Sequence, residues 1–355
     1  MYAGCWDKSI WSWDATTRAL RRRYFGHADF VKAVVCVRAP WLSPALDASS
    51  SDGDDGDLLI SGGADACIIV WRASNGTKLH TLRGHTRGIL SLAIAPLFLF
   101  SSLPNDDDQF SNSTARSTLE LFSAGSDPSI RRWQLTPDSA RELAAVHTHA
   151  TSVDAIRFHV PLDATLPEDV ELWTASADKT AQCLTPPPSA TGNVATDAAT
   201  ATATAASSWT PHTTLPHADF VRDVLAVPGE GLVVTACRDE GVRVWDTSGD
   251  GDGDDDGDDA AACVHVYDGH YDEVTALASV KGGRQVVSVG IDGTVRCWDA
   301  GRAAVLGARE EARRREAEKS NAAPPAAAAA AAAVRSLLTA EEEAELAALM
   351  DEDDE

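Results

Sequence analysis

Residues 288–299 read Ser-Val-Gly-Ile-Asp-Gly-Thr-Val-Arg-Cys-Trp-Asp. Apolar residues alternate with others on both sides of Asp292, which predicts two short strands joined by a tight turn. An Asp in such a turn caps backbone N–H groups with its carboxylate. Ser288 stands four residues before this Asp, and Trp298 stands six residues after it. The arrangement decides the fold because the same spacing returns along the chain.

The interval of six residues from Asp to an aromatic residue occurs six times in residues 1–300, with Leu184 replacing Trp once. The six pairs are Asp7 and Trp13, Asp65 and Trp71, Asp127 and Trp133, Asp178 and Leu184, Asp239 and Trp245, Asp292 and Trp298. A Ser or Thr precedes the Asp by four residues in every copy except the first, where Ala3 stands. Such a repeat predicts an architecture of similar units that pack side by side.

A His precedes five of the copies, usually directly after a Gly. Asp, His, Ser or Thr, and Trp are complementary hydrogen-bond donors and acceptors, so we predict that they tie each small sheet together through a buried polar network. The predicted network comprises Asp65, His27, Ser61, Trp71, Asp127, His85, Ser123, Trp133, Asp178, His149, Thr174, Asp239, His217, Thr235, Trp245, Asp292, His270, Ser288 and Trp298.

These residues define the WD-repeat family, which the sequence resembles over residues 1 to about 300. The Trp–Asp pair itself stands at Trp13-Asp14, Trp245-Asp246 and Trp298-Asp299. The resemblance implies an all-β fold, a β-propeller of four-stranded blades with about six recognisable repeats. The first repeat is incomplete, which favours a shortened form of a seven-bladed parent over a six-bladed ring with a thin first blade. We expect Arg302–Leu306 to add the outer strand of the last blade.

Four inserts, near residues 43–57, 101–117, 186–208 and 248–260, are acidic or rich in Ser, Asn, Ala, Thr and Pro. They have little to bury, and we predict that they are disordered. Residues 1–300 therefore form the predicted propeller.

Residues 301–355 form a predicted low-complexity acidic tail with short helices. Thr339 and Glu342 fit a capping box, and the helix that they open carries Leu346, Leu349 and Met350 on one side. Two interpretations of this helix stay open, a segment that docks on a partner and a charged solubilising tail.

Charge excludes several classes of partner. The 355 residues hold 30 Lys and Arg against 54 Asp and Glu, a formal net charge of −24. This charge argues against binding to nucleic acid or to an anionic membrane. No apolar run approaches the ~18 residues of a membrane span, and the N-terminus lacks the pattern of a signal peptide. The seven scattered cysteines fit a reducing compartment, the cytoplasm or the nucleus.

Motifs of catalysis are not found in the sequence. The Asp, His and Ser or Thr set resembles a hydrolytic triad, but a triad occurs once per site and this set recurs in five copies. We therefore predict no enzyme activity, no cofactor, no metal and no small-molecule substrate.

Function is then expected on a surface, namely the top face, which we define as the end of the blades that carries the His-containing loops and the Asp turns. The phrase at residues 27–32 (HADFVK) returns at residues 217–222 (HADFVR). Aromatic residues and Arg on a rigid surface are typical interface anchors. For Phe30 and Phe220, packing between blades is the alternative. The predicted partner-binding residues are Trp6, Phe30, Lys32, Arg87, Phe220, Arg222, Arg238, Tyr271 and Glu273.

The sequence thus predicts a non-catalytic protein–protein interaction scaffold or adaptor within a multi-subunit complex. Two alternatives stay open. One is a subunit of an RNA-processing or chromatin complex that contacts nucleic acid, and the other is a propeller enzyme that uses the central channel, near which Lys32, Asp154, Arg222 and Asp223 are expected.

Overall fold

The computed structural model describes residues 1–38, 57–96, 118–162, 164, 169–187, 209–248 and 261–322. The chain divides into two compact units, Met1–Val305 and Leu306–Glu355. The four predicted inserts, apart from their described margins, and the predicted helix at Thr339–Met350 lie outside the described residues. Asp57, which the sequence analysis placed in the first insert, instead begins a strand.

The described residues form six antiparallel sheets, which we number blades 1 to 6 in chain order. Blade 1 has three strands, β1 (Tyr2–Gly4), β2 (Ser9–Trp13) and β3 (Leu20–Phe25). Blade 6 also has three, β20 (Val274–Val280), β21 (Gln285–Gly290) and β22 (Val295–Asp299).

The four middle blades have four strands each. They are β4 (Val31–Arg38), β5 (Asp57–Gly63), β6 (Cys67–Arg72) and β7 (Lys78–Arg83); β8 (Ile89–Ile94), β9 (Leu119–Gly125), β10 (Ile130–Leu135) and β11 (Ala140–Val146); β12 (Val153–His159), β13 (Glu171–Ser176), β14 (Thr180–Thr185) and β15 (Thr210–Pro216); β16 (Val221–Val227), β17 (Leu232–Cys237), β18 (Val242–Asp246) and β19 (Ala262–Tyr267). The prediction of an all-β propeller with about six repeats, the first incomplete, is confirmed.

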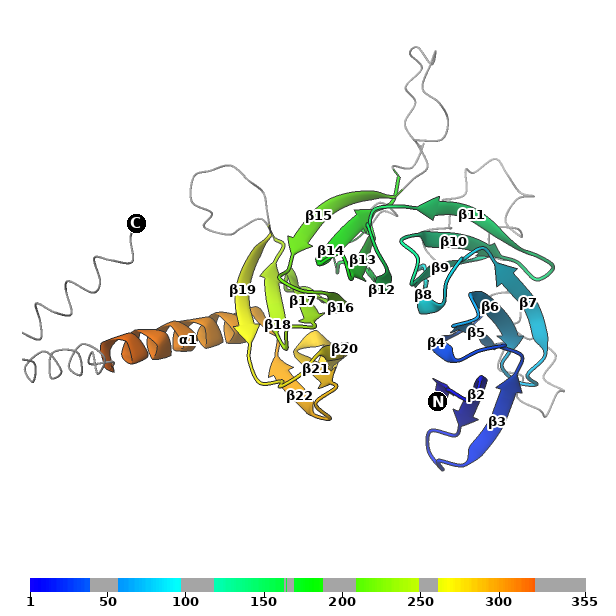
Figure 1. Ribbon diagram of the computed structural model, residues 1–355, viewed down its shortest axis with the longest axis horizontal. Coiled ribbons are helices and arrows are strands. Elements are labelled where there is room, and N and C mark those ends of the chain that lie inside the picture. The colour runs from blue at the N-terminus through cyan, green and yellow to red at the C-terminus, as the bar shows by residue number, and fades with distance from the viewer. Residues whose placement is uncertain are drawn as a thin grey trace, which may run out of the picture. The chain divides into compact units, whose positions relative to one another are not determined.

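Each blade follows the alternation that its sequence predicts. In the middle blades the first strand lies on the inner side and the fourth on the outer side (Figure 1). The inner strands contact one another in chain order, β4 with β8, β8 with β12, β12 with β16 and β16 with β20. Apolar faces of adjacent blades therefore bury each other, and this burial provides most of the stabilisation.

The interface of blades 1 and 2 shows how these cores are built. Ile10 and Tyr24 of blade 1 pack with Leu59, Ile69 and Trp71 of blade 2. The Ile three residues after one Asp turn thus faces forward, and the Trp six residues after the next Asp turn faces back. Every blade consequently has a forward face, towards the next blade, and a backward face, towards the previous blade.

The segment after blade 6 differs from the prediction. Arg302–Leu306 does not add an outer strand, because it forms the start of helix α1 (Arg302–Ala322). Ala, Arg and Glu, which dominate the helix, are strong helix formers. Arg302 fixes the first turn, since its backbone N–H donates to Glu230 (2.9 Å) and its guanidinium donates to Asp246 (2.6 Å). Blade 6 therefore keeps three described strands.

Candidate partner-binding face

The polar network of blade 2 is a directed chain of hydrogen bonds. The Trp71 indole N–H donates to Ser61 Oγ (2.9 Å), and Ser61 lies 2.8 Å from His27 Nε2. A carboxylate only accepts, so His27 Nδ1 carries a proton and donates to Asp65 (3.1 Å), which also accepts the backbone N–H of Ala28 (2.7 Å). The chain joins a top-face loop to the Asp turn of the same blade.

Blades 3 and 6 repeat the whole chain, and blade 4 repeats it without the Trp. The His-to-carboxylate distances are 2.8 Å for His85 and Asp127, 2.8 Å for His149 and Asp178, and 3.0 Å for His270 and Asp292. Recurrence in four blades is what a structural role requires, and a catalytic role does not explain it.

Blade 5 departs from the predicted network. His217 Nδ1 donates to the Leu215 carbonyl (3.0 Å) and does not bond to Asp239. Asp239 instead accepts two bonds from Arg243, four residues further on (2.8 and 2.6 Å). This charge-assisted pair replaces the imidazole only in blade 5, since Arg131 and Arg296 hold the same position in blades 3 and 6, where Asp127 and Asp292 keep their His. Without a carboxylate beside it, burial lowers the pKa of His217 to about 4.

Blade 1 has no network His, and its Asp turn is held in another way. Asp7 accepts the hydroxyl of Ser9 (2.5 Å), the indole N–H of Trp11 (3.1 Å) and the guanidinium of Arg23 (2.7 Å). These hydrogen bonds, that of Ser9 first, lower the pKa of Asp7 to about 2. The turn therefore presents its neighbour Trp6 from a fixed backbone.

Trp6 and Phe30 form an aromatic pair on the top face. Trp6, in the turn between β1 and β2, is 82% exposed, and Phe30, in the loop before β4, is 38% exposed. Their rings stack with centroids 5.4 Å apart and planes 19° from parallel. The pair bridges blades 1 and 2, so Phe30 both packs between blades and remains accessible.

Phe220 occupies the equivalent loop of blade 5 and is half-buried. The guanidinium of Arg238 lies 5.2 Å from its ring centroid, and that of Arg222 lies 5.9 Å away. Arg222 also forms ion pairs with Asp154 (2.5 Å) and with Glu273. Arg222 and Glu273 are thus engaged between blades, whereas Arg238 is exposed.

The remaining predicted residues lie apart on the same face. Lys32 and Arg87 are exposed, and the structure shows no ion pair for either within the described ranges. Tyr271 is 79% exposed, with the Arg296 guanidinium 5.7 Å from its ring centroid. The structure therefore brings the predicted residues together as two separate aromatic groups and leaves the others isolated.

An acidic hollow of about 430 Å³ was missed by the sequence analysis. It lies between the Asp turn of blade 5 and the loop before β20, and its lining includes Asp239, Glu240, Asp268 and Tyr271. The sequence held one sign of this hollow. Glu240 directly follows the repeat Asp239 and therefore lies in an Asp turn of the top face, as Lys8 does after Asp7. The hollow itself is acidic, although the exposed Arg238 directly precedes Asp239.

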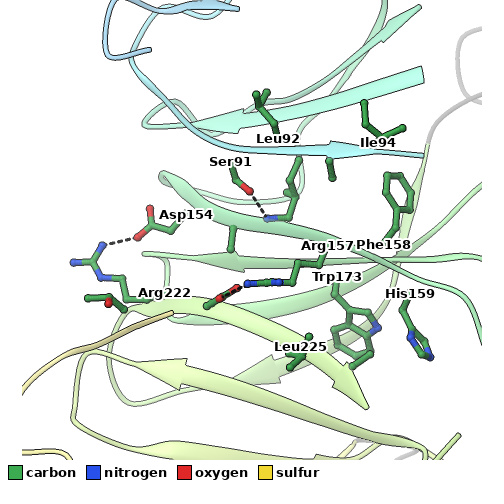
Figure 2. Close-up of a pocket in the computed structure, with 16 residues that line it drawn as sticks. Ser91, Leu92, Ile94, Asp154, Arg157, Phe158, His159, Trp173, Arg222 and Leu225 are labelled. Carbon is green, nitrogen blue, oxygen red and sulfur yellow. Dashed lines mark hydrogen bonds and ion pairs between the residues drawn. The ribbon is translucent and has the colours of Figure 1, made fainter. Parts of the chain in front are cut away.

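The inner strands line a second hollow, of about 550 Å³ (Figure 2). Arg157 of β12, which the sequence analysis missed, donates to both oxygens of Asp223 (2.8 and 2.6 Å) and to the Leu277 carbonyl (2.9 Å). Asp223 also accepts the Leu277 N–H (2.8 Å). Arg157 and Asp223 thus link β12, β16 and β20, so these charged residues hold blades 4, 5 and 6 together.

The family comparison agrees with this geometry. The model of the family described as "WD domain, G-beta repeat" matches residues 209–246 and 261–299, which cover β15 to β18 and β19 to β22.

Several curated relatives match most of the chain, among them the following two. An uncharacterized WD repeat-containing protein of Schizosaccharomyces pombe is 28% identical over 310 residues, which cover 84% of this chain and 62% of the relative. The nuclear distribution protein PAC1 of Arthroderma otae is 24% identical over 294 residues, which cover 82% of this chain and 45% of the relative. The chain therefore spans about half the length of these curated relatives.

A chain in the crystal structure of the Mitotic Checkpoint Complex has a similar fold. The TM-score is 0.57 at 15% identity, over 84% of this chain and 71% of the other. Among the described residues, no helix is both long enough and apolar enough to cross a membrane. The repeated network, the six antiparallel blades and the matching relatives lead to one conclusion: the chain is similar to WD-repeat proteins, and two of its segments, residues 209–246 and 261–299, match the model of that repeat.

Proposed function

We propose that this chain is a non-catalytic scaffold that binds partner proteins through its top face. The observation that carries the proposal is the Trp6 and Phe30 pair, a large aromatic surface that is exposed yet held by stacking and by the network of the Asp7 turn. Rigid, exposed aromatic side chains lose little conformational entropy on binding and serve as anchors of protein interfaces.

The charged residues of the top face indicate which charges a partner would carry. The top face carries exposed Lys8, Lys32 and Arg87 on blades 1 to 3 and the acidic hollow of Glu240 and Asp268 between blades 5 and 6. A partner that spans the face would therefore place acidic groups near blade 1 and basic groups near blade 6. Phe220 and Arg238 lie on the same face and form the second proposed contact.

A scaffold role fits the paired charges of the inner hollow better than catalysis does. Asp223, the most enclosed carboxylate there, is fully engaged by Arg157 and by the Leu277 N–H. We place the protein in the cytoplasm or nucleus, in keeping with its cysteine pattern and with relatives that are named nuclear distribution proteins.

The experiment that tests the proposal is an affinity capture with quantitative mass spectrometry. It compares the full chain with the variant Trp6→Ala, which removes an exposed ring and should leave the fold intact. The control is Leu162→Ala, because Leu162 is 80% exposed in the loop after β12, at the opposite end of the blades.

We expect a defined set of proteins that the control retains and that Trp6→Ala loses by about tenfold or more. A set captured equally by all three forms would contradict the proposed use of the top face. Circular dichroism of each variant separates this result from misfolding.

A further inference from the structure

Two loops of the top face have the same sequence and share two anchors. Residues 27–31 and 217–221 both read His-Ala-Asp-Phe-Val and lead into the inner strands β4 and β16. In both, the His Nε2 lies 2.8 Å from the hydroxyl of the repeat Ser or Thr. The carbonyl of the Phe accepts the N–H of the residue before the repeat Asp, at 2.7 Å in blade 2 and 2.9 Å in blade 5. Any further difference between the loops therefore comes from their surroundings.

In blade 2 the start of the loop is tied to the Asp turn. Asp65 accepts the imidazole N–H of His27 (3.1 Å) and the backbone N–H of Ala28 (2.7 Å). Blades 3, 4 and 6 also keep the second bond, with distances from the backbone N–H to the carboxylate of 3.0, 3.1 and 3.1 Å. The loop and the Asp turn are therefore joined in these four blades.

Blade 5 lacks both bonds. The Nδ1 of His217 donates to the carbonyl of Leu215 (3.0 Å), within the same segment. The N–H of Ala218 has no hydrogen-bond partner among the described residues, and its carbonyl accepts from Lys179 of blade 4 (3.0 Å). Residues 217–220, which we call the blade 5 loop, thus begin without attachment to the Asp turn of their own blade.

The reason lies two residues after the repeat Asp. Blades 3, 5 and 6 all carry an Arg four residues after this Asp, but only blade 5 carries a Gly two residues after it, Gly241. A Cβ at this position would lie 2.8 Å from Nη1 of Arg243 and 3.2 Å from Oδ1 of Asp239. The ion pair therefore takes the space of a side chain at residue 241. Ser129 and Thr294 hold the equivalent position in blades 3 and 6.

Blade 6 shows the opposite arrangement with the same Arg. The hydroxyl of Thr294 donates to Asp292 (2.9 Å), and Asp292 keeps its contact with His270 (3.0 Å). The guanidinium of Arg296 lies instead 5.7 Å from the ring centroid of Tyr271. A hydroxyl residue two positions after the Asp accordingly accompanies the network, and a Gly accompanies the ion pair.

We propose that the blade 5 loop is the conformationally adjustable part of the top face, released from its Asp turn by Gly241 and Arg243. The turn keeps its form when the loop shifts, because Arg243 holds Asp239 within the turn and its strand. A segment with fewer hydrogen bonds opens at a lower cost in free energy. That Phe220 uses this freedom to fit a partner rests on the function proposed above, whereas the release of the loop does not.

The test is hydrogen exchange of backbone amides in the isolated full chain, followed by NMR. Ala28 and Ala218 are a matched pair, because His precedes and Asp follows each of them. We expect the amide of Ala218 to exchange about tenfold faster or more than that of Ala28, whose N–H is bonded to Asp65.

Two variants are designed to restore the missing bonds. Gly241→Thr gives blade 5 the residue of blade 6 at this position, and its Cβ displaces the far end of the Arg243 side chain. Arg243→Ile removes the guanidinium and copies Ile69 of blade 2. Glu240→Gln is the matched control, because Glu240 is exposed in the same turn and does not bond to Asp239 or Arg243 within the described ranges.

We expect Gly241→Thr and Arg243→Ile to slow the exchange of Ala218 by about tenfold, and Glu240→Gln to leave it unchanged. The pKa of His217, whose ring lies near Arg243 and Asp239, should rise above about 4 in Gly241→Thr as the carboxylate returns to the imidazole. An NMR titration of the His217 ring measures it.

Two results would overturn the proposal. The first is equal exchange of Ala28 and Ala218 in the unmodified chain, a comparison that needs no variant. The second is a folded Gly241→Thr chain in which Ala218 exchanges as fast as before. Neither measurement involves a partner, so a failure of the scaffold function would leave the release of the blade 5 loop standing.

Discussion

Strands β18 and β22 have almost the same sequence and opposite surroundings. Val242–Asp246 reads VRVWD and Val295–Asp299 reads VRCWD, so they differ at one position. Both follow an Asp turn at the same spacing, and both pair with a preceding strand. Val242 and Val244 are fully buried, whereas Val295 and Cys297 are exposed.

The difference shows which level of structure the local sequence determines. Alternation and the turn residue suffice to form a strand and to fix its register. Burial depends on what lies beside the strand, which is β19 and blade 6 for β18. The same five-residue pattern thus forms a core in one blade and an open surface in the next.

The largest expected difference in stability comes from placing an Asp at the equivalent positions 244 of β18 and 297 of β22. Val244→Asp places a carboxylate in the core between blades 5 and 6 and should lower the free energy of unfolding by about 4 kcal/mol. Cys297→Asp should change it by less than about 0.5 kcal/mol, because Cys297 is exposed. Urea unfolding of both variants measures the difference. Equal losses would show that Cys297 is covered in the isolated chain.

The next effect is a dependence of stability on pH that comes from His217 of blade 5. The pKa of His217 is about 4, below its ordinary value, so the unfolded chain binds the proton first. Stability from this group is therefore full above pH 6.5 and falls as the pH drops towards 4, by up to about 3 kcal/mol.

Unfolding of the chain and of His217→Asn between pH 7.5 and 4 measures this contribution. The gap between their free energies of unfolding should be widest at pH 7 and should shrink in acid. A gap that does not change with pH would refute the buried, neutral state of His217.

A smaller effect is expected from the hydroxyl of the network. Thr235→Val in blade 5 leaves the buried indole N–H of Trp245 without an acceptor and should cost about 2 kcal/mol. Ser288→Ala in blade 6 should cost about 1 kcal/mol, because Trp298 is only half-buried and water can replace the lost acceptor. Thermal unfolding of the two variants gives the ranking, and the reverse order would contradict the difference in burial.

The smallest effect comes from exchanging the one residue by which the strands differ. Val244→Cys removes buried apolar volume and should cost about 1 kcal/mol. Cys297→Val makes β22 identical to β18 and should alter stability by less than about 0.5 kcal/mol. The same unfolding assay measures both, and a clear gain for Cys297→Val would mean that this side chain is buried in solution.

Much of the fold could be predicted because its determinants are local. Asp, Ser or Thr, and Trp stand at fixed spacings, and their hydrogen bonds in blades 2, 3 and 6 need no information from other blades. The outer strand expected at Arg302–Leu306 was inferred from the number of strands that a blade needs and against local propensity, since Ala and Leu are strong helix formers.

The candidate site was less accessible to sequence reasoning. The link from Arg157 to Asp223 joins residues of different blades that are 66 positions apart, and spacing in the sequence does not encode such a contact. The pair of Asp239 and Arg243 is only four residues apart, but the same spacing in blades 3 and 6 does not produce it. The exposure of Val295 also depends on a neighbour, and its sequence alone is that of a buried strand.

The most direct test of this account is hydrogen exchange of individual backbone amides in the isolated full chain, followed by NMR. Val242 and Val244 pair with β19, whereas Val295 and Cys297 point their N–H groups to an open edge. The account predicts that the amides of Val295 and Cys297 exchange at least about 1000-fold faster than those of Val242 and Val244. Equal protection of the two strands would contradict it.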